Sequence, residues 1–453
     1  MRSVSFLLTA SLACFVRAQL LFAAPPALQP LIDAAKPGER IEPAAGVYSG
    51  PVVIDKPIIL DGRGVVTIDG GYRGSVVSIK THGATLQNMR IIGSGDRHNE
   101  VDAGIQVQGN FNIVQNNVVE DVLFGIDLSD AQGNTLRNNN VRSREVELGV
   151  QGDGLRLWHS NSNTVTDNVI CHARDSVVWY SENNTIKHNV FCHGRYGLHF
   201  MYARYNLVED NDIHHNSVGI FLMYSDGMRI RNNRVSWGQG PTSMGIGFKE
   251  ASDVIVENNT IYYAGRGLYF DVSPMEPDSI NLMQSNQVSF CGAAVAFHND
   301  WSGNEFHNNV FTNNFEQATV NTRATVNRNL WDGNYWDDYH GFDLNHDDIG
   351  DTPYRQWLYS DQTWLNVPYA SFYNASPILS MVAMIERLIP FSEPVLLLQD
   401  NKPLLKPLSG SISTYRHTHQ EGVGGAEKID PFGLYSDDNR AAPMPRSDLK
   451  EHE

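Results

Sequence analysis

Short runs in which apolar and polar residues alternate recur along most of this chain. Most runs follow one order: Gly, then Ile or Leu, then any residue, then Leu or an aromatic residue. Such alternation is typical of short strands, because successive side chains in a strand point to opposite faces. The clear copies are GIQV (104–107), GIDL (125–128), GLRL (154–157), GLHF (197–200), GIFL (219–222), GIGF (245–248) and GLYF (267–270), with weaker copies at 176–179, 294–297 and 318–321.

An asparagine recurs in step with these runs, in motifs such as IVQNNVV (113–119) and IVENNTI (255–261). Repeats of roughly 20 to 30 residues indicate a solenoid. Because the apolar spacing is strand-like, we predict an all-β fold, a right-handed parallel β-helix in which each repeat is one coil. Stacked Asn side chains can then bond along a ladder. The Asn predicted to be equivalent are Asn117, Asn139, Asn168, Asn189, Asn211, Asn233, Asn259, Asn286, Asn309 and Asn329.

The segments around the repeat differ from it in composition. The first residues combine a basic start, an apolar stretch and small residues, which predicts a secretory signal peptide. The last segment is polar, charged and contains Gly and Pro, which predicts disorder. The predicted organisation is a signal peptide at 1–24 with cleavage between 18 and 24, a parallel β-helix at 25–344 with a capping helix at 27–35, a C-terminal cap and partner-docking segment at 345–408, and a disordered tail at 409–453.

Within the docking segment, residues 376–391 carry an apolar pattern with helical spacing. The stretch is too interrupted to span a bilayer. Two compatible interpretations are a helix that caps the solenoid and a helix that docks on a partner or at a membrane interface. The residues on its apolar side are Ile378, Met381, Met384, Ile385 and Leu388.

Composition narrows the class of partner. The formal charge of −17 argues against a nucleic-acid binder and against electrostatic attachment to an anionic membrane, since both require clustered Lys and Arg. Removal of the signal peptide leaves Cys171, Cys192 and Cys291. An odd number of cysteines in an exported protein implies at least one free thiol or a metal ligand.

A methionine face, defined as His199, Met201 and Met223, is predicted on the outside of the coils. In GLHF, Leu198 and Phe200 point inward, so His199 and Met201 point outward. The equivalent outward pairs of nearby coils are Arg156/Trp158, Val178/Tyr180 and Phe221/Met223. Thioether sulfur and imidazole suit Cu(I), whereas the alternative is a Met-rich surface that contacts another protein.

A second group, the sulfur–imidazole cluster, repeats a pair of residues in three consecutive coils. Three interpretations stay open: core packing with a disulfide, buried free thiols, and a metal site. Its members are Cys171, His172, Cys192, His193, His214 and His215.

After the repeat, Asp343, Asn345, Asp347 and Asp351 follow the spacing of a calcium-binding loop. The match is incomplete, because Asp348 replaces the Gly of the sharp turn and Tyr354 the bidentate Glu. The alternative is an Asx-rich terminal turn.

The outward columns of the coils show no grouped carboxylates, so no catalytic residue is predicted and the chain is expected not to be an enzyme. The alternative is a carbohydrate-binding protein or a polysaccharide lyase or hydrolase, since such proteins often use parallel β-helices.

The signal peptide, the Asn-ladder repeat, GNYWDDYHGFDLNHDDIGDTPY (333–354) and ASPILSMVAMIERLIPFSEPVLLL (375–398) together resemble the NosD family. The resemblance covers about residues 28 to 405. It implies a periplasmic, non-enzymatic accessory protein in nitrous oxide reductase maturation, with no required cofactor. It further implies an ABC transporter permease and its ATPase, a copper chaperone and the reductase as partners. Residues 376–391 would then dock on the permease, which gives peripheral contact with the membrane.

Overall fold

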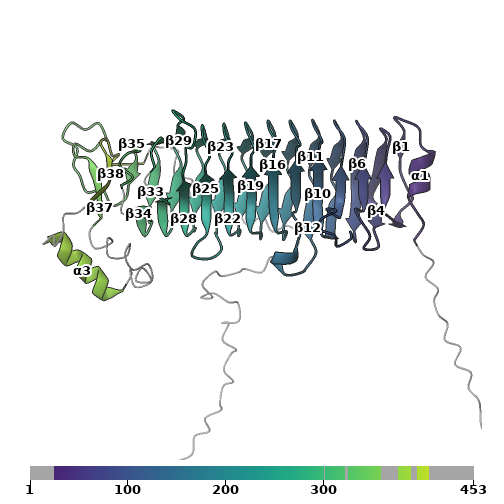
Figure 1. Cartoon of the computed structure of the whole chain (residues 1–453), viewed down its shortest axis with the longest axis horizontal. Helices are drawn as coiled ribbons and strands as arrows, with labels where there is room; N and C mark the ends of the chain where they lie inside the picture. Colours follow the sequence, from purple (N-terminus) through teal and green to yellow (C-terminus); the bar gives the residue numbers. More distant parts are fainter. Residues whose placement is uncertain (1–24, 300, 322–324, 359–375, 389–394, 408–453) are drawn as a thin grey trace, which may run out of the picture.

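The computed structural model describes residues 25–299, 301–321, 325–358, 376–388 and 395–407. The predicted signal peptide and the predicted tail lie outside these ranges. The described chain forms an elongated parallel β-helix, with one short helix at the N-terminal end and a strand pair and a helix at the C-terminal end (Figure 1). No helix among the described residues has the length and apolar character needed to cross a membrane.

Three walls of parallel strands build the β-helix, and most coils contribute one strand to each wall. Two walls are joined into one 24-stranded sheet through the long strands β4 and β6, and the third wall is a separate 12-stranded sheet. The first wall contains β1 (Arg40–Ile41), β4 (Ile59–Asp69), β6 (Thr85–Ile92), β8 (Ile113–Gln115), β11 (Thr135–Arg137), β14 (Thr164–Thr166), β17 (Thr185–Lys187), β20 (Leu207–Glu209), β23 (Arg229–Arg231), β26 (Ile255–Glu257), β29 (Asn281–Gln284), β32 (Asn304–His307) and β35 (Leu330–Asp332).

The second wall adds the later halves of β4 and β6 to a column of short strands. These strands are β2 (Gly46–Ser49), β9 (Val118–Val122), β12 (Asn140–Ser143), β15 (Val169–Cys171), β18 (Val190–Cys192), β21 (Asp212–His214), β24 (Arg234–Ser236), β27 (Thr260–Tyr262), β30 (Gln287–Ser289), β33 (Val310–Thr312) and β36 (Tyr335–Trp336).

The third wall carries the Gly-led runs noted in the sequence. Its strands are β3 (Val52–Ile54), β5 (Val77–Ile79), β7 (Ala103–Val107), β10 (Phe124–Ser129), β13 (Leu155–Trp158), β16 (Asp175–Trp179), β19 (Tyr196–Met201), β22 (Val218–Met223), β25 (Met244–Lys249), β28 (Arg266–Asp271), β31 (Ala293–Phe297) and β34 (Glu316–Val320). The elements outside the walls are α1 (Gln29–Ala34), the 3-10 turn η1 (Leu148–Val150), the antiparallel pair β37 (Tyr354–Leu358) and β38 (Val395–Asp400), and α3 (Pro377–Leu388).

The repeated glycine of the third wall is explained by close approach between coils. A Cβ atom on Gly197 would lie 2.5 Å from the Ile213 side chain and 2.7 Å from the carbonyl oxygen of Gly219. Any larger residue would push neighbouring coils apart. The residues that follow it alternate as predicted, and Leu198 and Phe200 are fully buried in the core.

A ladder of buried Asn side chains runs along the corner before the second wall. Each Nδ2 donates to Oδ1 of the Asn in the next coil, as from Asn189 to Asn211 at 3.0 Å and from Asn211 to Asn233 at 2.9 Å. The stacked Asn predicted from the sequence are therefore present. The members are Asn117, Asn139, Asn168, Asn189, Asn211, Asn233, Asn259, Asn286, Asn309 and Asn334.

The prediction that Asn329 is the last member of this ladder was wrong. Asn329 precedes β35 of the first wall and accepts from Asn304 in a second ladder at 3.0 Å, whereas Asn309 donates to Asn334, which precedes β36. The motif at 325–331 therefore lies one strand earlier in its coil than the other copies do.

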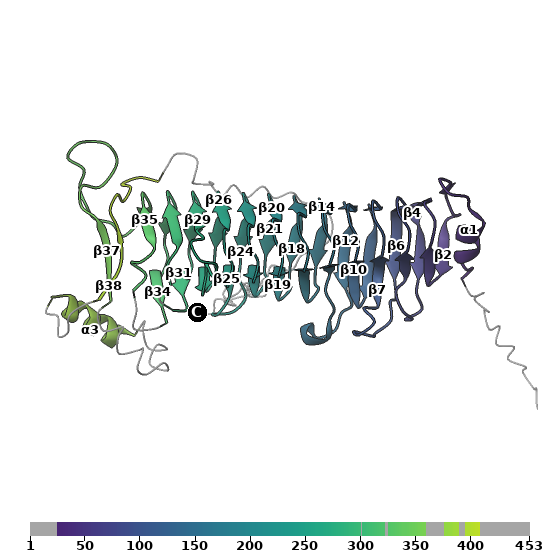
Figure 2. The ribbon, with the colours of Figure 1, turned by 45° about the horizontal axis from the view of Figure 1, so that its top comes forward.

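Both ends of the core are covered. At the N-terminal end, Leu28 and Ile32 are fully buried beside α1, which confirms the predicted capping helix. At the C-terminal end, the Tyr354 ring stacks on the Trp336 ring with centroids 4.5 Å apart. The last coil strand ends at Trp336, and the cap then follows from β37 and β38 (Figure 2).

Candidate metal-binding and docking sites

The methionine face lies on the outer surface of the third wall. Met201 of β19 lies beside Met223 of β22 in the parallel register, and both side chains are partly exposed. His199 is on the same face of the same strand. The register brings the two thioethers into adjacent coils, with the imidazole two residues from one of them.

The prediction that Val178 and Tyr180 point outward was wrong by one residue. Trp158 pairs with Trp179, and Trp179 pairs with Met201, so the outward residues of β16 are Val177 and Trp179. The register between β16 and β19 shifts after Asp175, which a count of residues from the repeat does not show. Val178 is fully buried in the core instead.

His199 faces outward, but it is covered by aromatic side chains and only 8% exposed. Its ring stacks on Tyr196 at 4.7 Å and meets Trp179 at 5.8 Å and Phe221 at 6.0 Å, all between centroids. Both ring nitrogens are buried and have no hydrogen-bond partner among the described residues. Burial lowers the pKa of His199 to about 4. The imidazole is therefore neutral at pH 7, and a buried unpaired nitrogen of this kind calls for an explanation such as a ligand.

Next to this face lies a buried acid–arginine network that the sequence reasoning missed. Arg174 contacts Asp153 at 2.8 Å, and Arg195 contacts both carboxylate oxygens of Asp175 at 3.0 and 2.5 Å. Burial raises the pKa of Asp153 to about 6, although the Arg174 charge opposes the rise. Each pair spans one coil, with partners 21 and 20 positions apart in the sequence, and this interval was the available signal.

The two aspartates lie outside the outward columns, in which no grouped carboxylates were expected, and they do not resemble an open catalytic site. Asp153 and Asp175 are each 3% exposed and held by arginines. Burial and pairing with arginine hold these two carboxylates inside the wall, out of contact with solvent.

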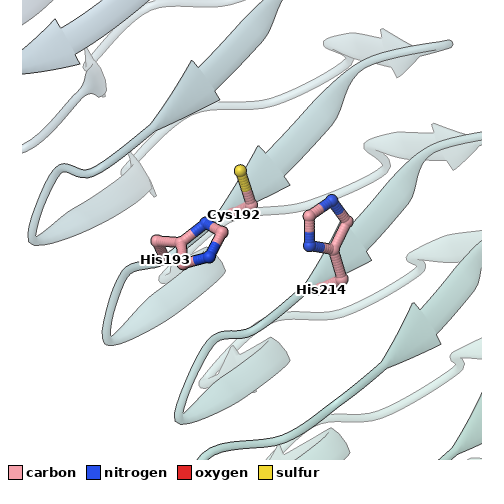
Figure 3. A group of neighbouring side chains, drawn as sticks. All are labelled: Cys192, His193 and His214. Atoms are coloured by element: carbon pink, nitrogen blue, oxygen red, sulfur yellow. The ribbon is translucent and has the colours of Figure 1, made fainter. Parts of the chain in front are cut away.

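In the sulfur–imidazole cluster, Cys171 of β15 and Cys192 of β18 form a disulfide with their Cα atoms 4.5 Å apart. The same register places His214 of β21 beside Cys192. Of the three interpretations from the sequence, the structure shows the disulfide, and the interpretation with two free thiols was wrong for this state. Cys192, His193 and His214 nevertheless offer three ligand atoms within 4.8 Å of one another (Figure 3).

The four imidazoles of the cluster are tightly packed. His193 stacks on His172 at 4.6 Å and on His215 at 5.0 Å between centroids, and Nδ1 of His214 lies 2.8 Å from Nδ1 of His215. Burial lowers the pKa of His193 and His214, and lowers the pKa of His215 to about 4. The cluster therefore presents neutral rings at pH 7.

The His stack belongs to a longer series of rings at one corner of the β-helix, and a second series lines another corner. The rings in each series stack from coil to coil, on residues with a left-handed backbone. Only the three histidines of the first series were recognisable from the sequence, because the other members are not identical residues. They are His172, His193, His215, Trp237, Tyr263 and Phe290, and His159, Tyr180, Tyr202 and Tyr224.

The calcium-like loop has the internal bonding of an Asx-rich turn. The carboxylate of Asp343 accepts the backbone N–H groups of His346 at 2.6 Å and Asp348 at 3.0 Å. Asp351 accepts from the backbone of Leu344 at 2.7 Å, and the Asn345 amide donates to Asp347 at 3.0 Å. These contacts match the alternative interpretation, and calcium binding stays a prediction.

Helix α3 lies at the C-terminal end of the molecule (Figures 1 and 2). Four apolar residues of its predicted docking side are more than half exposed, and Ile385 is half-buried. The exposed fractions are 71% for Ile378, 55% for Met381, 56% for Met384 and 73% for Leu388.

Solved structures that this chain is similar to are distant. The A-module of a mannuronan C-5 epimerase from Azotobacter vinelandii is 15% identical, with a TM-score of 0.46 over 66% of this chain and 92% of that one. A mannuronic-acid-specific family 6 polysaccharide lyase from human gut microbiota is 12% identical, with a TM-score of 0.45 over 68% and 83%. Likenesses at this level say nothing about activity.

Sequence comparisons are more specific. Residues 65–170 match the family described as "Right handed beta helix region", in agreement with the predicted hand of the solenoid. Residues 142–341 match the family described as "Periplasmic copper-binding protein (NosD)". The "Probable ABC transporter binding protein NosD" of Pseudomonas aeruginosa is 26% identical over 380 residues, which cover 77% of this chain and 84% of the relative. Both sequence matches therefore support assignment of the chain to the NosD family.

Proposed function

We propose that this protein is a periplasmic scaffold that docks on an ABC transporter, formed by a permease and its ATPase, and takes part in assembly of the copper–sulfide centre of nitrous oxide reductase. The family description and the name of the Pseudomonas relative support the compartment, the metal and the transporter. The observation that carries the docking step is the exposed apolar side of α3.

Burial of the exposed apolar side of α3 against a partner would be energetically favourable. Ile378, Met381, Met384 and Leu388 lie at helical spacing and leave a stripe of large apolar side chains in water. Burial of such a side chain stabilises by roughly 1.5 to 3 kcal/mol, so an amphipathic helix that lies in an apolar groove gains several of these contributions. The permease, as a membrane protein with a periplasmic face, is the partner that fits this position.

The methionine face supplies the copper step of the proposal. Its donor set, two thioethers and an imidazole, suits Cu(I) better than a hard cation. The unpaired nitrogens of His199 favour a role for this residue, since packing alone leaves them without partners. Copper is here the cargo, received from a chaperone and passed towards the reductase along the rigid outer wall.

The test uses the full-length, tagged protein expressed with its neighbouring transporter genes and purified from membranes in mild detergent. Met381→Glu combined with Met384→Glu places two charges in the apolar stripe and is expected to abolish co-purification of the permease and ATPase. The matched control is Met275→Glu with Ile280→Glu, because these residues are 50% and 47% exposed and lie in the loop between β28 and β29, outside α3. Retention of the transporter by the α3 variant would contradict the docking step.

The competing class, a carbohydrate-active β-helix, makes a different prediction in the same preparation. Purified protein incubated with uronans would release unsaturated or reducing ends. We expect no such release, and cleavage would overturn the scaffold proposal as a complete account.

A further inference from the structure

We propose that reduction of the Cys171–Cys192 disulfide opens a binding site for a thiophilic d10 metal ion in the sulfur–imidazole cluster, so that the cluster is a redox-gated metal site. The inference does not depend on the proposed function, because it concerns metal binding by the isolated chain. It is also separate from the methionine face, which lies on another wall and contains no cysteine.

The donors are already gathered on the backbone. Ligand atoms of Cys192, His193 and His214 lie within 4.8 Å of one another in the disulfide state. Ligands of one tetrahedral ion with bonds of about 2.0 to 2.3 Å are separated by about 3.3 to 3.8 Å. The difference is within the reach of side-chain rotation, with no movement of the strands.

Reduction frees both sulfur donors. The two cysteines face each other in register with Cα atoms 4.5 Å apart, so the Cys171 sulfur stays beside Cys192 after the bond opens. Two thiolates and two imidazoles then make the S2N2 donor set that Zn(II) and Cu(I) prefer. In the oxidised state both sulfurs are bonded to each other, and neither is available as a thiolate.

The imidazoles are held for this role by their neighbours. Nδ1 of His214 lies 2.8 Å from Nδ1 of His215, so His215 fixes the orientation of the His214 ring. Nδ1 of His193 is buried, and no described residue forms a hydrogen bond with it. His215 is thus a positioning residue, comparable to the outer partners that orient metal-bound histidines in known sites.

The site is reachable and its surroundings are close to neutral. Cys171, His193 and His214 are partly exposed at a corner of the β-helix. The nearest cations are paired, Arg142 with Glu145 and Arg234 with Asp212. Because the charge of each arginine is compensated by its acidic partner, neither arginine strongly repels an approaching metal cation.

The redox step needs a dithiol reductant of the exported thiol–disulfide oxidoreductase class. One thiolate of the reductant attacks a sulfur of the Cys171–Cys192 bond to form a mixed disulfide, and its second thiol resolves this intermediate. Two electrons and two protons reach Cys171 and Cys192, and the reductant leaves as a disulfide. Metal binding then releases the thiol protons.

The experiment compares oxidised and reduced protein. The purified chain is reduced with excess dithiothreitol, freed of reductant anaerobically, and titrated with Cu(I) or Zn(II) against a chromophoric chelator. We expect reduced protein to bind one more ion than oxidised protein, and the two arms identify the ion. A reduced protein that gains no binding for either ion would overturn the proposal.

Variants identify the residues that bind the additional metal ion. Cys171→Ser with Cys192→Ser should remove this binding, whereas Cys291→Ser, which deletes the free buried thiol of another coil, should keep it. His215→Asn retains a residue that tolerates the left-handed corner, and it should weaken the gained site by about 10- to 100-fold. If the cysteine double variant fails to fold, wild-type protein that has been reduced and alkylated provides the same test. If the alkylated protein still bound the additional metal ion, Cys171 and Cys192 could not be its ligands.

Discussion

The side-chain amide of Asn334 donates to the buried carboxylate of Asp400 at 2.9 Å, and this bond ends the long Asn ladder. The same oxygen accepts the backbone N–H of Asn334 at 2.9 Å and Nε1 of Trp336 at 3.2 Å. Asp400 closes β38, so one carboxylate ties the C-terminal cap to the last coil. The cap is thus attached through polar groups as well as through the buried Leu397 and Leu398.

Asp400→Ala should destabilise the C-terminal end by roughly 3 kcal/mol or more, because several buried donors lose their acceptor at once. Urea unfolding followed by the fluorescence of Trp331 and Trp336 reports on this end. Asp400→Asn keeps one acceptor oxygen and should therefore lower the free energy of unfolding clearly less than Asp400→Ala does. An alanine variant no weaker than the asparagine variant would show that the hydrogen bonds contribute little.

Asp153→Asn should change how stability depends on pH. The pKa of Asp153 is raised to about 6, so between pH 4 and 6 the folded chain holds a proton that the unfolded chain has released. Wild-type protein is therefore expected to lose about 2 kcal/mol relative to the variant between pH 4.5 and 6.5. Denaturant unfolding at the two pH values measures the difference, and the exposed Asp278→Asn variant is the control. Parallel pH profiles for wild type and Asp153→Asn would disprove the prediction.

Tyr202 stacks between Tyr180 and Tyr224, with centroids 5.1 and 4.9 Å away, and its backbone is left-handed with φ at 50°. Both Tyr202→Ala and Tyr202→Gly lose the stacking, but only Gly adopts this backbone without strain. The Gly variant should therefore be about 1 kcal/mol more stable than the Ala variant. Thermal unfolding of the two proteins measures this difference. At Tyr269, inside β28, the order should reverse, since Gly weakens a strand.

Cys291 should resist alkylation in the folded protein. Burial raises the pKa of its thiol to about 12, so almost no thiolate exists at pH 8. Iodoacetamide treatment followed by mass spectrometry should label Cys291 only after denaturation. In reduced protein the partly exposed Cys171 should react first, and native labelling of Cys291 would indicate that its coil opens readily.

Met201→Ala with Met223→Ala should weaken Cu(I) binding in both redox states, because the methionine face contains no disulfide. Competition with a chromophoric Cu(I) chelator measures the affinity. Met275→Ala with Met381→Ala removes two exposed thioethers elsewhere and should leave the affinity unchanged. Equal affinities for wild type and the Met201/Met223 variant would exclude this face as a copper site.

Much of the fold was readable from the sequence, because one coil repeats its glycine, its apolar positions and its Asn at near-constant intervals. The pairing of Met201 with Met223 and of Cys171 with Cys192 follows from that interval alone. Errors arose where the interval changes, as at Val178 and Tyr180, where a register shift makes Val177 and Trp179 the outward residues. Asn329 was assigned to the wrong ladder for the same reason.

Other features depend on contacts that no repeat encodes. The burial of His199 comes from rings on three strands, which a column of outward residues cannot reveal. Asp400 lies outside the repeat, 66 residues from Asn334, and only the path of the C-terminal segment brings it back to the ladder. The choice between a disulfide and free thiols required the side-chain positions as well as the register.

The ladder also gives the β-helix a direction. Every amide in it points its N–H towards the C-terminal end, so the side-chain dipoles add along the axis and leave their positive end at Asn334. A carboxylate at that position neutralises the dipole, as an anion does at the N-terminus of an α-helix. Because a carboxylate only accepts, no further amide can continue the series beyond it. The same carboxylate therefore ends the ladder and fastens the strand pair that covers the last coil, at the end where an uncovered coil would leave unpaired strand edges.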